Sequence, residues 1–334
     1  MQKISGDIIL SIGINPKTIL LKGFFMKQVK FLVFADLHHY PGVFYTDARN
    51  KLAEIMKRAE DEKVDFAVSL GDFNHSCGTF TEIFEDIKKY SVPLYHVMGN
   101  HDTDGASLQE VLKAYNMPHE YYYFDINGFR FIVLDTNYYG YSGGQVHFQY
   151  RNYFDFPKTR EHMPQKEMEF LKEAIATAPG QCILFSHASL ERHHSGGGGT
   201  FNQPQIREII KEANANSRKV IMSCNGHHHR DFLRILDNVA YFDVNSASFD
   251  WLNQPHDHFP KELCEAYDLA DHQAIWTKPL SAVVTISDDG TIEIEGSKSE
   301  YLYGVTREMS PNVICDGAGR PCSVEILSAK FKLF

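Results

Sequence analysis

The sequence predicts an α/β fold, a four-layer α/β/β/α sandwich in which two mixed β-sheets pack face to face between outer helices. Strand and helix patterns alternate along much of the chain, which is typical of parallel βαβ units. Strand-rich segments follow these units twice, and this repetition predicts two sheets. With 334 residues and 43% hydrophobic content, the chain is long enough to bury a core of this size.

Three strands alternate with three helices at the start of the domain. The predicted strands are the apolar runs at residues 30–36, 64–72 and 93–100. Apolar residues at helical spacing follow each strand, over residues 47–62, 79–90 and 106–115. Each strand run ends in polar or charged residues. Because ligands of such sheets bind beyond the carboxyl ends of the strands, these ends are the first candidates for a functional site.

The second half of the chain repeats this organisation. Hairpins are expected over residues 121–135, around Asn127–Gly128, and over residues 281–296, around Asp289–Gly290. Further elements are expected in this order: a helix over 164–178, a strand over 181–187, a helix over 203–214, a strand over 219–229 and antiparallel strands over 231–248. Residues 137–162 are rich in aromatics and predict a long functional or capping loop, and residues 195–201 predict a flexible one.

The two ends of the chain differ from the domain between them. Residues 1–25 are expected to be an N-terminal extension, residues 26–300 the domain, and residues 301–334, which show little pattern, a C-terminal tail. No apolar run is long enough to span a membrane, and the N-terminus is a poor signal peptide. The six cysteines form no CxxC pair, which favours free thiols and a cytoplasmic location, although a bridge between Cys315 and Cys322 stays open.

The charge of the chain limits its partners. The net charge is −10, so broad attraction to nucleic acid or to an anionic membrane is not expected. The oligomeric state is left open. The 17 histidines include adjacent groups at His38–His39, His193–His194 and His227–His229, and such clustering indicates metal binding.

Five polar clusters lie at the ends of predicted strands. They are Asp36-Leu37-His38, Gly71-Asp72, Gly99-Asn100-His101-Asp102, Ser186-His187 and Gly226-His227-His228-His229. These side chains suit ions of intermediate hardness, such as Mn²⁺, Fe²⁺/³⁺ or Zn²⁺. Alternate residues of an extended segment point the same way, so Asp36 and His38 can reach one ion together, and so can His227 and His229. Asp72 can use both of its oxygens to bridge two ions.

In this order, the set D-x-H, G-D, G-N-H-D, H and G-H-x-H resembles the calcineurin-like metallophosphoesterases over roughly residues 29–250. The resemblance implies two metal ions. The first would take Asp36, His38, Asp72 and His229, and the second would take Asp72, Asn100, His187 and His227. His39 stays open as an alternative to His38, and His228 as an alternative to a neighbouring ligand. A water bridging the two ions would lose a proton and attack phosphorus.

The resemblance also implies how the leaving group departs. His101 would protonate the leaving alkoxide or hydrogen-bond the phosphoryl group, and Asp102 would orient His101. A purely structural role in the loop is equally open for Asp102. Two further residues are candidates for substrate binding: His75, three residues after Asp72, and Arg192, in the loop after His187. An ordinary loop residue and a solvated linker are the alternative interpretations of these two.

The motifs also indicate a branch of this superfamily. The chain has GDFNH and GNHD but lacks the extended GDxVDRG and GNHE motifs, so it is closer to the phosphodiesterases and nucleotidases than to the phosphoprotein phosphatases. We therefore expect hydrolysis of a small phosphodiester or nucleotide-like substrate. A phosphomonoesterase or diphosphatase is the alternative within the enzymes. A metal-stabilised interaction scaffold without catalysis is the alternative from another class.

Overall fold

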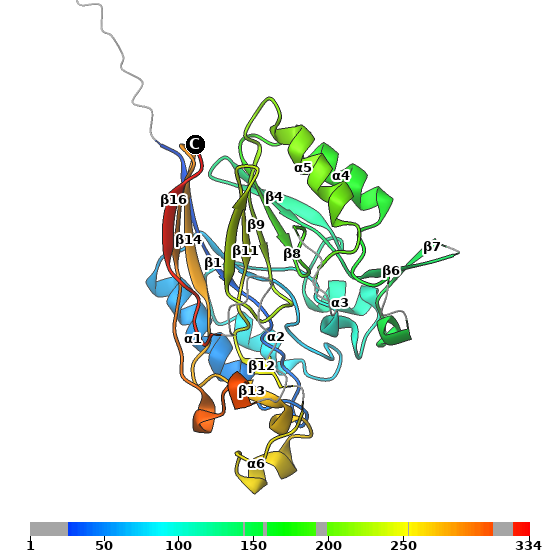
Figure 1. Cartoon of the computed structure of the whole chain (residues 1–334), viewed down its shortest axis with the longest axis vertical. Coiled ribbons are helices and arrows are strands. Elements are labelled where there is room, and N and C mark those ends of the chain that lie inside the picture. The colour runs from blue at the N-terminus through cyan, green and yellow to red at the C-terminus, as the bar shows by residue number, and fades with distance from the viewer. Residues whose placement is uncertain (1–25, 143, 156–158, 192–198, 253, 310–322) are drawn as a thin grey trace, which may run out of the picture.

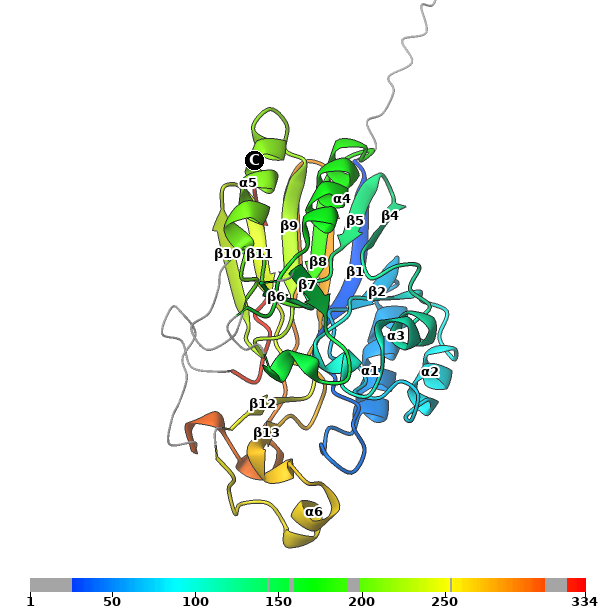
Figure 2. The ribbon, with the colours of Figure 1, turned by 90° about the vertical axis from the view of Figure 1, so that its right-hand side faces the viewer.

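The computed structural model describes residues 26–142, 144–155, 159–191, 199–252, 254–309 and 323–334. Two six-stranded mixed sheets pack face to face, and helices cover their outer faces (Figures 1 and 2). The predicted four-layer α/β/β/α sandwich is confirmed. The expected N-terminal extension, residues 1–25, lies outside the described residues, as do Arg192, Cys315 and Cys322.

The first sheet has the strand order β16-β15-β14-β1-β2-β3. Its parallel half contains β1 (Gln28–Phe34), β2 (Phe66–Ser69) and β3 (Leu94–His96). Its antiparallel half contains β14 (Ala282–Ser287), β15 (Thr291–Glu295) and β16 (Ala329–Lys332). The sequence analysis found little pattern beyond residue 300 and missed β16, which is the edge strand of this sheet.

The second sheet has the strand order β10-β11-β9-β8-β5-β4. Its parallel strands are β5 (Phe129–Val133), β8 (Cys182–Ser186), β9 (Val220–Asn225) and β11 (Val239–Asp243). Antiparallel strands lie at both edges, namely β4 (Tyr122–Ile126) and β10 (Phe232–Leu236). The parallel strands of both sheets end at the same end of the sandwich, which brings their polar ends together (Figure 2).

The helices are amphipathic and each group covers one sheet. The helices on the first sheet are α1 (Ala48–Asp61), α2 (Glu82–Ile87) and α3 (Leu108–Ala114). Those on the second sheet are α4 (Gln165–Ala176) and α5 (Gln203–Asn214). For example, Leu52, Ile55 and Met56 of α1 are buried against the outer face of β1. Helix α3 begins with a capping box between Ser107 and Glu110.

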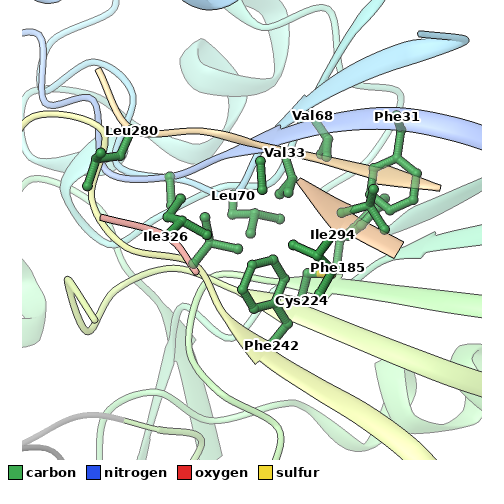
Figure 3. Close-up of a cluster of buried hydrophobic side chains, with 14 of the residues drawn as sticks. Phe31, Val33, Val68, Leu70, Phe185, Cys224, Phe242, Leu280, Ile294 and Ile326 are labelled. Atoms are coloured by element: carbon green, nitrogen blue, oxygen red, sulfur yellow. The ribbon is translucent and has the colours of Figure 1, made fainter. Parts of the chain in front are cut away.

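The core between the two sheets is aromatic and aliphatic, and Figure 3 shows part of it. Phe31 of β1 packs edge-on against Phe185 of β8, with ring centroids 5.7 Å apart. Phe31 also stacks on Phe66, with centroids 5.2 Å apart. These side chains are fully buried, so the core holds the two sheets in a fixed relation. The strand ends that carry the polar clusters are therefore fixed relative to one another.

Smaller elements surround the polar end of the sandwich. They are the strand pairs β6 (Tyr138–Tyr141) with β7 (Gly144–His147) and β12 (Phe249–Trp251) with β13 (Gln273–Ile275), the helix α6 (Lys261–Ala266), and short 3₁₀ turns at His101–Thr103, Asn152–Asp155, Ala270–His272, Leu302–Gly304 and Arg307–Met309. The expected loop over residues 137–162 thus contains a two-stranded sheet and a turn of helix. In the part of the chain that the structure describes, no helix is both long and apolar enough to cross a membrane.

Candidate dinuclear metal centre

In the described part of the chain, three groups of side chains that could hold a metal ion lie near the ends of the parallel strands. Two of them are Asp36, His38 and His229, and Asp72, His187 and His227; they contain the residues that the sequence predicted as ligands. The third, His75, His101 and Asp104, lies beside them. In each group the potential ligand atoms all lie within 4.8 Å of one another. The residues of the first two groups follow β1, β2, β8 and β9, which belong to two different sheets. Face-to-face packing of the sheets therefore brings together side chains that are far apart in the sequence.

The first group is fully buried. His229 Nε2 lies 3.5 Å from Asp36 Oδ1 and 3.2 Å from His38 Nε2. The other ring nitrogen of His229, Nδ1, lies 2.7 Å from the Phe249 carbonyl oxygen and donates to it. Because Nδ1 carries the proton, the Nε2 of His229 keeps a free lone pair, which faces the other two side chains.

The second group has His187 at its centre. His187 Nε2 lies 3.0 Å from Asn100 Oδ1, 3.1 Å from His227 Nδ1 and 3.3 Å from Asp72 Oδ2. The Nδ1–H of His187 donates to the Leu70 carbonyl oxygen at 2.8 Å, so its Nε2 is available as a ligand. Asn100 adds an amide oxygen to this group, as the sequence analysis expected.

Asp72 lies between the two groups. Its Oδ2 lies 3.3 Å from His187 Nε2 and 3.8 Å from His38 Nε2. Its Oδ1 accepts the backbone N–H of His101 at 2.8 Å. The expectation that Asp72 uses both oxygens to bridge two ions stays a prediction, because an oxygen that accepts one N–H keeps a second lone pair. In this geometry Oδ2 is the oxygen that lies toward both groups.

The donor set fits two cations. The buried imidazoles present lone pairs to one another and to carboxylate oxygens, an arrangement that is repulsive without a shared cation. Burial lowers the pKa of His38 well below its usual value, so this ring is neutral and able to bind a metal. Burial also lowers the pKa of His187, but the adjacent Asp72 carboxylate raises it to about 10, and a metal ion would take the place of that proton.

The backbone at the ligands is in an unusual conformation. Asp36, His38, Asp72, His227 and His229 all have positive φ, between 50° and 70°. The premise of extended segments was therefore wrong, because left-handed turns aim these side chains at the site. Such positions cost of order 1–3 kcal/mol each and concentrate at functional sites. The turns are held by hydrogen bonds, among them Asp36 N–H to the Gly71 carbonyl at 3.0 Å and His227 N–H to Asp36 Oδ2 at 3.0 Å.

The glycines beside the ligands allow close approach as well as turns. A Cβ on Gly226 would lie 2.7 Å from Asp36 Oδ2, and one on Gly71 would lie 2.5 Å from His187 Nδ1. Real Cβ atoms do not come so close to other heavy atoms. Gly71 also has φ of +100°, which favours glycine. A side chain at either position would therefore displace a metal-ligating residue.

His101 is held by a carboxylate that the sequence analysis did not select. Its Nδ1–H donates to Asp104 Oδ2 at 2.8 Å, and the hydroxyl of Tyr153 donates to Asp104 Oδ1 at 2.7 Å. Burial lowers the pKa of His101, but the carboxylates of Asp72 and Asp104 more than offset this and raise it. His101 is thus placed beside the second metal group with its ring orientation fixed by Asp104.

Asp102 has a different role from the one the resemblance implied. Its two oxygens accept four backbone N–H groups and one hydroxyl: those of Asp72 at 3.0 Å, Phe73 at 2.7 Å, Asn74 at 3.0 Å, Gly99 at 2.7 Å and Tyr115 at 2.6 Å. Asp102 is fully buried, and its carboxylate faces the backbone and not the ring of His101. The expectation that Asp102 orients His101 is therefore wrong. Asp102 instead ties together the loops after β2 and β3.

The remaining candidate residues, His39, His228 and His75, lie outside the two groups proposed to hold the ions. His39 pairs with Glu82 at 2.8 Å, and His228 Nδ1 lies 3.6 Å from Asp243, so neither belongs to the two metal groups. His75 is almost fully buried but is among the residues that line the cleft beside these groups, and its predicted contact with substrate stays a prediction. Its Nε2 lies 2.8 Å from His38 Nδ1 and its Nδ1 lies 3.2 Å from Asp104 Oδ2. This histidine links a metal ligand to the carboxylate that holds His101.

A cleft of about 600 Å³ opens onto these groups. Asn100, His101 and His227 are among the residues that line it. The sequence analysis missed several residues of the cleft and its surroundings: Asp104, Tyr153, Arg160 and Glu161. Asp104 could have been found, because it lies three residues after His101, and a turn brings side chains at this spacing together. The other three carry no signal in the sequence, since only the folded segment 137–162 places them here.

Comparisons with known proteins agree with this geometry. A family model described as calcineurin-like phosphoesterase matches residues 29–231, which is more than half of the chain. The chain belongs to the calcineurin-like phosphoesterases. Members of this family are metal-dependent hydrolases that act on phosphoester bonds, so the resemblance seen in the sequence is confirmed. A search of curated proteins finds no match to this sequence.

Solved structures share the fold of this calcineurin-like phosphoesterase. A dimetal phosphatase from Danio rerio superposes with a TM-score of 0.58 at 13% identity, over 80% of this chain and 95% of its own. GAP50, described as the anchor in the inner membrane complex of Plasmodium, superposes with a TM-score of 0.52 at 14% identity, over 91% of this chain and 89% of its own. At this level of identity the likeness is one of fold.

Proposed function

We propose that this calcineurin-like phosphoesterase binds two metal ions and hydrolyses a small phosphoester. The observation that carries the proposal is Asp72 Oδ2, which faces both groups of buried ligands. The first ion is held by Asp36, His38, Asp72 and His229. The second ion is held by Asp72, Asn100, His187 and His227. Mn²⁺, Fe²⁺/³⁺ and Zn²⁺ are the metals that this mixture of carboxylate, imidazole and amide ligands favours.

The chain's own residues complete the chemistry. A pair of bound ions supplies a hydroxide nucleophile at neutral pH and neutralises the phosphoryl oxygens. His101 gives a proton to the departing oxygen, and its position in the lining of the cleft beside Asn100 and His227 supports this role. Asp104 keeps Nδ1 of His101 protonated, which directs the other ring nitrogen, Nε2, away from Asp104.

The substrate is a small phosphodiester or a nucleotide-like compound, and a phosphomonoester is the second candidate. The size of the cleft and its aromatic residues, including Tyr40, Phe44 and Trp251, support a compact organic group beside the phosphate. The free thiols of Cys77, Cys182, Cys224 and Cys264 support the expected reducing, cytoplasmic location, which stays a prediction.

Two chromogenic esters test the proposal. The protein is freed of metal, reloaded with Mn²⁺ and assayed with bis-p-nitrophenyl phosphate and with p-nitrophenyl phosphate. We expect metal-dependent release of p-nitrophenol, faster from the diester. No turnover of either ester at full metal occupancy would contradict the proposal and would favour the scaffold interpretation. Faster turnover of the monoester would move the assignment to a phosphomonoesterase.

A pair of variants separates the roles of the two aspartates. In Asp104→Asn, we expect the turnover number to fall by roughly 10- to 100-fold, as when an outer-shell partner is lost. The melting temperature and metal content should change little. In Asp102→Asn, we expect a lower melting temperature, because one acceptor oxygen is replaced by an amide that repels the surrounding N–H donors.

The opposite result for the two aspartate variants would reverse their roles. If Asp102→Asn lost turnover at unchanged stability while Asp104→Asn behaved like the wild type, Asp102 would be the residue that orients His101. Asp61→Asn is a suitable control, because Asp61 is an exposed carboxylate on α1 that pairs only with the exposed Lys57 among the described residues.

A further inference from the structure

Two arginines line the cleft beside the metal groups, and the proposed reaction assigns no role to either of them. They are Arg151 and Arg160, and both come from the segment that caps the polar end of the sandwich. Their cleft neighbours include His101 and His227, one from each side of the proposed second metal site. The arginines therefore share one cavity with the reacting centre.

Arg160 lines this cleft and is only partly paired. Its backbone forms an isolated bridge with Tyr139 of β6, which fixes where the side chain starts. Its Nε is buried and makes no hydrogen bond within the described part of the chain. Glu161 Oε1 lies 3.4 Å from this nitrogen, in a geometry that is not a hydrogen bond. A guanidinium with a buried, unsatisfied N–H is costly unless an anion completes it.

Arg151 is held in place by its neighbours. The preceding residue, Tyr150, donates its N–H to the Thr103 carbonyl at 2.8 Å, in the same turn as His101. The guanidinium of Arg151 lies over the ring of Phe154, 5.1 Å from the ring centroid. A second cation thus lines the cleft, one residue after a backbone that is hydrogen-bonded to the turn that carries His101.

The cleft also has aromatic walls. Phe44 and Trp251 pack edge to face with centroids 5.3 Å apart, and Tyr40 packs on Phe44 at 5.5 Å. All three line the cleft. Three carboxylates also line the cleft: Asp104, Glu161 and Asp268. Asp104 is taken up by hydrogen bonds to His101 and Tyr153, and Glu161 lies 3.4 Å from Arg160 Nε. This leaves Arg151 without a carboxylate partner among the described residues. Within the cleft an anionic group is therefore best placed at the arginines, and a flat organic group at the aromatic residues.

Building on the proposed function, we propose that the substrate is an organic phosphoester that carries a second phosphate group. The reacting phosphoryl group lies at the metal ligands, the second phosphate binds Arg160 and Arg151, and the organic part lies against Trp251 and Phe44. Water adds to the reacting phosphorus, the bond from this phosphorus to the oxygen of the organic group breaks, and that oxygen takes a proton from His101. A nucleoside diphosphate has this chemistry, whereas a nucleoside monophosphate lacks the second phosphate. The arginines thus act as specificity determinants for the second phosphate.

Calorimetric titration tests this without relying on turnover. The Mn²⁺-loaded protein is titrated with AMP and with the α,β-methylene analogue of ADP, which keeps its terminal phosphate. We expect the diphosphate analogue to bind roughly 10- to 100-fold more tightly, the value of a charge-assisted hydrogen-bonded pair. In Arg160→Gln this preference should disappear, while the affinity for AMP changes less than about twofold. Arg151→Gln, at an exposed position, should reduce the preference independently.

Arg207→Gln is the control variant. It removes an arginine on α5 that does not line the cleft and should leave both affinities unchanged. Equal affinity of the wild type for AMP and the diphosphate analogue would overturn the proposal. So would an Arg160→Gln variant that weakens both ligands equally or keeps the full preference. Absence of p-nitrophenyl ester hydrolysis, by contrast, would speak against the proposed function and not against the arginine site.

Discussion

Asp72→Ala should lose both metal ions and all measurable phosphoesterase activity. Asp72 Oδ2 is the one carboxylate oxygen that faces both ligand groups, at 3.3 Å from His187 Nε2 and 3.8 Å from His38 Nε2. Without it, the remaining ligands form two separate and incomplete sets. Elemental analysis after dialysis against Mn²⁺ should find two ions per chain in the wild type and fewer than one in the variant.

Thermal unfolding gives a second measurement of the same effect. A metal present at about 100 times its dissociation constant stabilises the fold by about 2.7 kcal/mol. Added Mn²⁺ should therefore raise the melting temperature of the wild type and leave that of the variant almost unchanged.

The variant Asp72→Asn controls for the possibility that Asp72→Ala loses metal and activity only because it misfolds. The asparagine keeps an oxygen for the backbone N–H of His101, which Asp72 Oδ1 accepts at 2.8 Å. It removes the charge that both metal groups share. We expect this variant to fold, and to show the same loss of metal and activity. Two ions per chain in a folded Asp72→Asn protein would refute the bridging role of this residue.

The gathering of the candidate ligands was predictable because of how parallel strands end. Asp36, Asp72 and His187 each directly follow an apolar run, and polar residues that follow buried strands of a parallel sheet converge at one edge. The local conformation was not predictable in the same way. A left-handed turn at Asp36 and His38 cannot be read from alternation of side chains, because it depends on hydrogen bonds to the neighbouring strand ends.

The errors in the sequence analysis have physical reasons. Asp102 directly follows His101, and this adjacency suggested a contact. In the 3₁₀ turn His101–Thr103, however, neighbouring side chains point in different directions, and the residue at i+3, Asp104, reaches the ring. The strand β16 was missed because it is short and lies at the end of the chain. Its alternation of Lys330 and Lys332 with Phe331 is a strand signal, but too brief to stand out.

His101→Ala should reduce turnover by roughly 10²- to 10⁴-fold, the range for a general acid or base. Metal content should be unchanged, because the His101 side chain belongs to neither of the two groups proposed to hold the ions; its own group, with His75 and Asp104, lies beside them. The loss should be small for a p-nitrophenyl ester, whose leaving group departs without a proton, and large for an alkyl ester, whose leaving group needs one. Rates for a series of esters, plotted against the pKa of the leaving alcohol, measure this difference.

The shape of that plot separates the two roles that His101 can have. If His101 protonates the leaving group, its removal makes turnover depend more steeply on the pKa of the leaving alcohol. If His101 only hydrogen-bonds the phosphoryl group, every ester slows by the same factor. His119→Ala is the matched control, because His119 is a half-exposed histidine outside the cleft. An unchanged rate for alkyl esters in His101→Ala would remove His101 from the reaction, and Asp104 would then have no catalytic ring to position.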